Sequence, residues 1–147
     1  MSNAFGPRWV PLGAAVLVAC WGAVMPVSVR GGGGPENVFV VVNSASADSI
    51  AVANAFVASR GIPPINILML PWQDSVESTT IARFRNELLA PIVKAIESRR
   101  LATQIDCIAW SSDYPWRIDY KDELPPELAA KDTYPSASLT GMTMLFA

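Results

Sequence analysis

The feature that most constrains this fold is a set of three short apolar runs, which occupy residues 37–42, 66–70 and 105–110. Each run is too short for a stable helix of its own, and the first is dominated by valine. Continuous rather than alternating apolarity is typical of strands that are buried on both faces of a parallel sheet. The three runs therefore predict three parallel strands.

Two amphipathic helices are expected between the runs. The first has apolar residues on its inner side, namely Ile50, Ala53, Phe56 and Val57. Either Ser46 or Asp48 can cap its start, and Gly61 is expected to end it. The second covers residues 78–99, with Pro91 predicted to kink or split it. Its apolar stripe consists of Ile81, Phe84, Leu88, Ile92 and Ala95.

The order strand, helix, strand, helix, strand predicts an α/β fold with right-handed crossovers. We expect a three-layer fold with a mostly parallel sheet, of the Rossmann-like or flavodoxin-like type. After Pro115 the pattern gives way to charges and prolines, with one short helix expected over residues 127–131. Because three strands make a narrow sheet, the α/β domain over residues 36–147 is expected to be truncated at its C-terminus.

A hydrophobic leader precedes the domain. Arg8 is followed by residues 10–27, which contain no ionisable group except the thiol of Cys20. This order is typical of a signal peptide, although the apolar stretch also reaches the ~18 residues at which a membrane span becomes possible. Residues 1–30 are therefore assigned as a signal peptide or N-terminal anchor, and residues 31–35 as a glycine-rich linker.

The two cysteines of the chain lie in different contexts. Residues 17–20 resemble a bacterial lipobox, in which the thiol of Cys20 is lipidated, but residues 21–27 continue apolar where lipoproteins turn polar. An ordinary signal peptide is the simpler interpretation. Cys107 lies inside the third apolar run and is expected to be a buried structural thiol, so no disulfide framework is predicted.

Charge and composition exclude several function classes. A net charge of −2 without a run of Lys or Arg removes the basic surface that nucleic-acid binding needs. The absence of histidine excludes Ser/His/Asp and Cys/His catalysis within these residues. The spacing of the acidic residues matches no calcium-binding loop, so we assign no metal site. We also assign no cofactor and no catalytic residue. Contact with a membrane is expected only through the N-terminal segment.

Polar side chains follow the first and third predicted strands. In a sheet of order 2-1-3, the chain reverses direction between these strands, and ligands bind beside such a switch point. Ser46 and Ser111 lie in the same two turns. The candidate ligand-binding residues are Asn43, Ser44, Asp48, Ser112, Asp113 and Arg117. They suit a small anionic or carbohydrate-like ligand. The simpler alternative is that Ser46 or Asp48 only caps the helix and that Asp113 pairs with Arg117.

Several segments share a pattern with one known family. They are residues 37–43, 53–68, 105–118 and 136–140, including Arg-Gly-Ile-Pro at 60–63, Asn-Ile-Leu at 66–68 and Pro-Trp-Arg-Ile at 115–118. These segments resemble the N-terminal half of a family of exported bacterial proteins from genomes that carry the exosortase/PEP-CTERM sorting system. The chain departs from the family in two ways: Ser112-Asp113-Tyr114 stands where the family has a glycine before a small apolar residue and proline, and the chain is shorter.

The resemblance implies an envelope location and a link to surface-protein sorting, and it carries over no catalytic residue. We therefore expect an exported periplasmic or extracellular protein with a non-enzymatic accessory or binding domain, whose partner is an envelope protein or a small polar ligand. One alternative is the N-terminal fragment of an exported, peptidase-like α/β hydrolase whose catalytic residues lie beyond residue 147. A truncated, non-functional product is the other.

Overall fold

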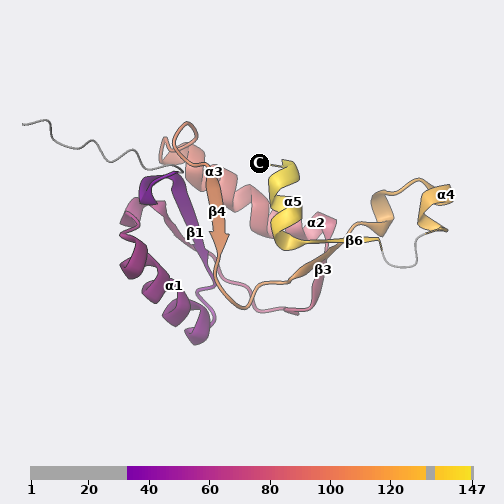
Figure 1. Cartoon of the computed structure of the whole chain (residues 1–147). Coiled ribbons are helices and arrows are strands. Elements are labelled where there is room, and N and C mark those ends of the chain that lie inside the picture. The colour runs from indigo at the N-terminus through magenta and orange to yellow at the C-terminus, as the bar shows by residue number, and fades with distance from the viewer. Residues whose placement is uncertain (1–32, 132–134, 147) are drawn as a thin grey trace, which may run out of the picture.

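The computed structural model describes residues 33–131 and 135–146 (Figure 1). The signal peptide or anchor assigned to residues 1–30, with Cys20, lies outside the described residues. Within the described part of the chain, no helix is long and apolar enough to cross a membrane. The strands are β1 (Val38–Val42), β2 (Ile67–Met69), β3 (Ser78–Thr80), β4 (Cys107–Trp110), β5 (Arg117–Asp119) and β6 (Ser136–Ser138). The α-helices are α1 (Ala47–Arg60), α2 (Ile81–Arg83), α3 (Ala90–Ser98), α4 (Pro126–Ala129) and α5 (Leu139–Phe146).

The first sheet has β1 at its centre, in the order β2-β1-β4. Both pairs of strands are parallel, with Val40 opposite Ile67 and Val41 opposite Trp110. The three predicted strands and their 2-1-3 order are therefore confirmed. Because β1 is central, its carboxyl end lies between the ends of the two other strands.

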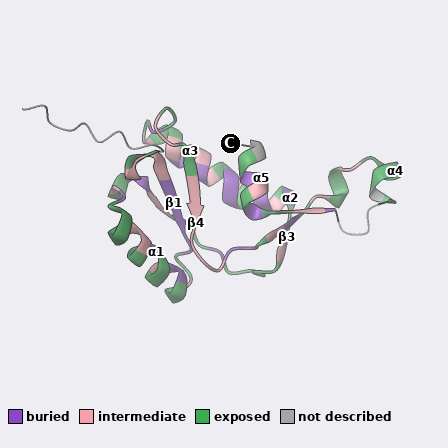
Figure 2. Ribbon diagram, viewed as in Figure 1, coloured by how far each residue is buried: buried purple, intermediate pink, exposed green. Residues whose placement is uncertain are grey.

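Helices pack against both faces of β1. Successive side chains of a strand point to opposite faces of the sheet, so β1 contributes residues to an apolar group on each side. Val40 and Val42 lie with Ala53 and Ile62 in one apolar group, on the side of α1. Phe39 and Val41 lie in a second group, which contains Phe84, Leu88, Ile92 and Ala95. Figure 2 shows β1 as a buried stretch between α1 and the other helices. The predicted inner faces of both helices are confirmed.

Helix α1 begins and ends as its sequence predicts. Ser46 is the N-cap, and its hydroxyl accepts a hydrogen bond from the backbone N–H of Ser49 at 3.1 Å. Gly61 ends the helix with a φ of 66°, in the left-handed conformation that glycine adopts without steric cost. Of the two predicted caps, the structure therefore uses Ser46, while Asp48 lies in the first turn.

The second predicted helix differs from its expected form at both Ser78 and Pro91. Residues Ser78–Thr80 form strand β3, and Thr80 caps α2 by accepting a hydrogen bond from the Arg83 N–H at 3.4 Å. A π-helical segment, Phe84–Leu89, then joins α2 to α3. Pro91, the second residue of α3, follows this segment directly. Because proline cannot donate the regular backbone hydrogen bond of a helix, the wider π-helical turn before it takes the place of the predicted break.

A second sheet, of order β3-β5-β6, was not predicted. Its first pair is parallel and its second antiparallel. The fully buried Ile118 of β5 packs in the same apolar group as Leu139 and Met142 of α5. The domain is thus mixed α/β with two small, mostly parallel sheets, and the segment after Pro115 is folded rather than irregular.

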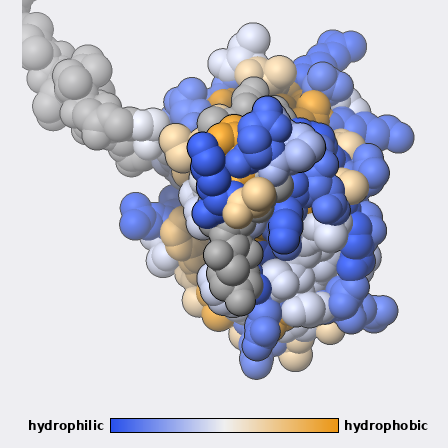
Figure 3. All heavy atoms as spheres, turned by 90° about the vertical axis from the view of Figure 1, so that its right-hand side faces the viewer, coloured by the Kyte–Doolittle hydropathy of each residue, from blue (hydrophilic) through white to orange (hydrophobic). Residues whose placement is uncertain are grey.

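The expected helix at 127–131 is observed as α4. It lies in the connection between β5 and β6, and this connection projects from the rest of the domain as an arm (Figure 1). The face on which this arm lies is mostly hydrophilic (Figure 3). Leu128 of α4 is 48% exposed. The arm therefore contributes little to the core.

Candidate functional site

The carboxyl ends of β1 and β4 meet in a network of polar side chains. We call this network the switch-point cluster; it consists of Asn43, Ser46, Ser49, Ser111 and Asp113. The Ser111 N–H donates to the Val41 carbonyl at 2.9 Å, which extends the contact between the strands into the turn. The cluster therefore joins the turn after β1, the start of α1 and the turn after β4.

Asn43 is the buried centre of the cluster and is only 2% exposed. Its Nδ2 donates to the carbonyls of Trp72 at 2.9 Å and Asp113 at 2.8 Å. Its Oδ1 accepts from the N–H groups of Ala45 at 3.0 Å and Trp72 at 2.9 Å. These four bonds use the full capacity of the side-chain amide. Asn43 thus positions three chain segments relative to one another.

Hydroxyl groups connect α1 to the turn after β4. The Ser46 hydroxyl donates to the Asp113 carboxylate, and the hydroxyls of Ser49 and Ser111 form a hydrogen bond with each other. Ser49 is fully buried, and its Oγ also accepts from the Asn43 N–H at 3.0 Å. The cap of α1 and the end of β4 therefore hold each other in place.

Backbone strain and an unpaired hydroxyl coincide at the end of β4. Asp113 has a φ of 64°, in the left-handed region that glycine favours and that Asp tolerates better than most residues. The neighbouring Ser112 Oγ is buried and has no hydrogen-bond partner among the described residues. An unpaired buried hydroxyl costs about 1–3 kcal/mol. Ser112 Oγ thus keeps an unused donor and acceptor at the end of β4.

The other candidate residues are placed differently. Ser44 and Asp48 are exposed on the turn after β1 and the first turn of α1, at the rim of the cluster. Arg117 lies on β5, and its guanidinium stacks over the ring of Trp116 at 5.3 Å from the centroid. The alternative pairing of Asp113 with Arg117 is not formed, because the ion pairs found within the described ranges involve Arg83 and Arg85.

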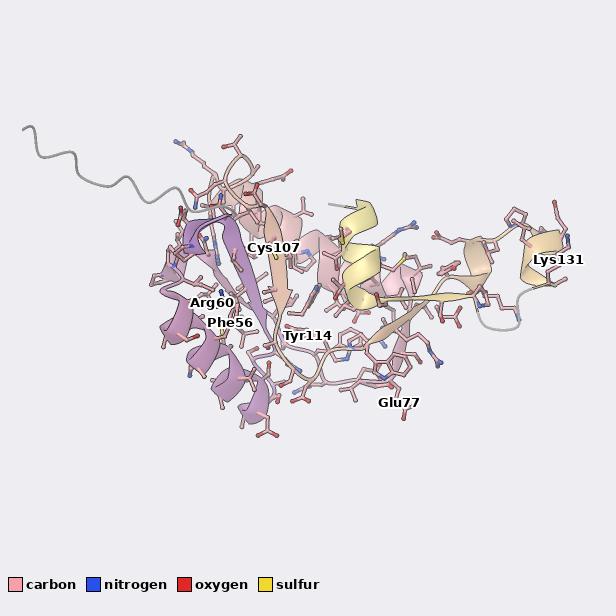
Figure 4. The ribbon with its side chains drawn as sticks, in the orientation of Figure 1. Phe56, Arg60, Glu77, Cys107, Tyr114 and Lys131 are labelled. Carbon is pink, nitrogen blue, oxygen red and sulfur yellow. The ribbon has the colours of Figure 1, made fainter. Side chains whose placement is uncertain are left out.

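Tyr114 follows Asp113 directly in the chain and was not among the predicted site residues. Its hydroxyl donates to the Leu70 carbonyl at 2.6 Å, and its ring meets that of Trp110 edge to face at 4.9 Å. Figure 4 shows Tyr114 near the end of β4. Burial raises the pKa of the Tyr114 phenol above its usual range, so the side chain stays neutral. Tyr114 lies three residues before the charged Arg117, and no apolar periodicity in this segment indicates its burial.

A cavity of about 600 Å³ lies at the other end of β4, away from the switch-point cluster. It is lined by α3, α5 and the segment that enters β4. Cys107 borders this cavity and is exposed, so the prediction of a buried thiol is wrong. The reason is topological: β4 is an edge strand, whereas a strand in the middle of a wide sheet would be covered.

Two further tests of the site are the search for metal-binding groups and the comparison with known proteins. Within residues 33–131 and 135–146, no group of His, Cys, Asp or Glu side chains could hold a metal ion. The arrangement offers hydroxyl groups, one carboxylate and backbone amides, which suit recognition by hydrogen bonds. Comparison of this chain with protein-family models, curated proteins and solved structures finds no match.

Proposed function

We propose that this protein is an exported cell-envelope protein whose domain binds a small, polar, uncharged ligand at the switch-point cluster without catalysing a reaction. The observation that carries the proposal is the buried Ser112 hydroxyl, which has no protein partner and lies beside the strained backbone of Asp113. Strain and unpaired polar groups in native proteins concentrate at functional sites.

The charges around the cluster favour a neutral ligand over an anion. Asp113 lies within the cluster and Asp48 stands exposed in the first turn of α1. Two carboxylates offset the positive end of the helix dipole that would attract an anion. Arg117, the one cation among the candidate residues, stacks on Trp116 instead. A sugar or other polyol, which both donates and accepts hydrogen bonds, fits these groups better than a phosphate or carboxylate.

The proposed location and fold have separate support. The leader pattern of residues 1–30 favours export, and the resemblance to the exosortase-associated family favours a role beside surface-protein sorting. A Rossmann-like or flavodoxin-like fold of three layers is supported by the β2-β1-β4 order and by helices that pack on both faces of β1. In such folds the turns after the first and third strands border the ligand.

A thermal-shift panel on the full chain tests the binding proposal. We expect at least one neutral sugar or polyol, among glucose, N-acetylglucosamine and myo-inositol, to raise the Tm, while inorganic phosphate does not. Ser112→Ala should abolish the shift, and the matched variant Ser44→Ala, at an exposed position, should weaken it less. If no neutral compound shifts the Tm, or if Ser112→Ala responds like the unmodified chain, the binding proposal fails.

Export is tested by cell fractionation. The full chain, expressed in a bacterium with a standard secretion system, should be recovered from the envelope or periplasmic fraction. A chain that lacks residues 1–30 should remain in the cytosol. Recovery of both forms from the cytosol would contradict the proposed location without bearing on ligand binding.

A further inference from the structure

The outer edge of β4 lacks a strand partner within the described residues. In the order β2-β1-β4, only one edge of β4 pairs with β1. The register sets Val41 opposite Trp110, and the Ser111 N–H donates to the Val41 carbonyl. Because backbone groups of successive residues point to alternate edges, the N–H and C=O groups of Ile108 and Trp110 face outward. A partner strand would find a row of donors and acceptors there.

The side chains of this edge do not protect it against pairing. Natural edge strands carry a charge, a proline or a bulge that prevents the approach of another strand. Residues 107–110 are Cys-Ile-Ala-Trp and contain none of the charged or proline residues that serve this purpose. The edge is therefore competent to accept a strand.

The 600 Å³ cavity lies alongside this edge. Figure 1 shows α5 on the side of β4 that faces away from β1, and both elements border the cavity together with α3. The apolar wall residues are Val93, Ile96, Ile105, Ile108 and Met144. Met144 is 79% exposed, so an apolar side chain of α5 stands open at the mouth. An added strand would lie about 4.8 Å from β4 and direct alternate side chains into this space.

We propose that the outer edge of β4 binds an extended segment of a partner polypeptide, which adds to the first sheet as its fourth strand. The partner's alternate side chains are apolar and fill the cavity between β4 and α5. At the end of the cavity near the start of β4, two acidic residues, Glu97 and Asp106, select a lysine or arginine of the partner. Main-chain hydrogen bonds supply affinity, and the apolar and acidic walls supply specificity.

Charge complementarity favours this occupant over a second copy of the chain. In an antiparallel pair of two β4 edges centred on Ala109, Ile108 would pair with Trp110, and Asp106 would face Ser112 of the other copy. Such a pair would leave both acidic residues of the cavity without a cation. The proposed surface is separate from the switch-point cluster, so either proposal can fail alone.

Fluorescence anisotropy on the full chain tests the proposal. The probes are two fluorescein-labelled peptides in which valine and threonine alternate over five residues, with a lysine at the first or the last position. At least one should bind, and methylation of its alternate backbone nitrogens, or replacement of lysine by glutamate, should weaken binding by about tenfold or more. Absence of binding by both peptides, or equal binding after both changes, overturns the proposal.

Variants of the chain locate the bound peptide. Met144→Lys, at the exposed wall of the cavity, should weaken peptide binding by about tenfold, while Leu128→Lys, at another exposed position on α4, should not. In a full chain that carries Cys20→Ser, bound peptide should slow the reaction of the Cys107 thiol with a thiol reagent. Equal effects of the two lysine variants, or an unprotected Cys107, overturn the proposal. So does a dimer of the free chain that Met144→Lys dissociates, because it assigns the edge to a second copy.

Discussion

The Ser46 hydroxyl donates a hydrogen bond to the Asp113 carboxylate, which lies 67 residues later in the chain. One serine thus both caps α1, by accepting from the Ser49 N–H, and fixes the turn after β4. The bond makes the geometry of the switch-point cluster depend on the docking of α1 against the sheet. Changes in the cluster should therefore alter stability as well as binding, and the two effects have to be measured separately.

Substitutions of Asp113 separate the side-chain bond from the backbone strain. Asp113→Gly loses the bond to Ser46 but adopts the left-handed conformation freely. Asp113→Ala loses the same bond and retains an unfavourable backbone, so it should be less stable than Asp113→Gly by about 1 kcal/mol. Urea denaturation of the two variants measures this difference. Equal stability would show that the backbone at this position relaxes and is not strained in the native state.

Asn43→Asp should be among the most damaging single substitutions in the domain. The change replaces the two donor bonds from Nδ2 to the Trp72 and Asp113 carbonyls by a buried carboxylate that faces both carbonyl oxygens. We expect a loss of about 3 kcal/mol or more in the free energy of unfolding.

The exposed neighbour provides the matched control for Asn43. Ser44→Asp introduces the same carboxylate one residue later and should change stability by about 0.5 kcal/mol or less. Chemical denaturation compares the two variants. Similar losses for both would mean that added charge in this turn, rather than the lost bonds of Asn43, causes the effect.

Tyr114 makes stability depend on pH in the alkaline range. The raised pKa of its phenol means that the native state keeps a proton that the unfolded chain releases at about pH 10. Above that pH the unfolded state binds fewer protons, so the free energy of unfolding falls as pH rises. Tyr114→Phe should be less stable than the unmodified chain by about 1 kcal/mol at neutral pH, because the bond to the Leu70 carbonyl is lost.

The difference in the free energy of unfolding between the unmodified chain and Tyr114→Phe should shrink between about pH 9 and 11. The unmodified chain loses stability over this range, whereas phenylalanine has no proton to lose. Urea denaturation at several pH values gives the difference, and Tyr120→Phe is the control for removal of a phenol elsewhere. A deficit that stays constant over this range would contradict a buried, neutral Tyr114.

The first sheet could be predicted because its elements are defined by local patterns. The apolar run at β1, the stripe on the second helix and Gly61 after α1 each report burial or backbone conformation directly. The second sheet could not be predicted, since Ser78–Thr80 and Ser136–Ser138 are short and polar. Such strands form because neighbouring elements bring them together, and no periodicity in the sequence records that contact.

The candidate site was predictable to a similar extent. Asn43 and Asp113 were expected near each other because parallel strands end at the same edge, and the Nδ2 of Asn43 reaches the Asp113 carbonyl. Arg117 was misplaced because β5 belongs to the second sheet, which carries the guanidinium toward Trp116. The contribution of Ser49 depends on its hydroxyl meeting Ser111, a contact between residues that are 62 positions apart.

Amide chemical shifts test the central claim most directly. In two-dimensional NMR spectra of the full chain, titration with the sugar or polyol that gives the largest thermal shift should move the amide signals of Ser44, Ser112 and Asp113. The same titration of Ser112→Ala should leave these signals in place. Shifts confined to residues around Cys107 and Met144, or no shifts at saturating ligand, would contradict a ligand site at the switch-point cluster.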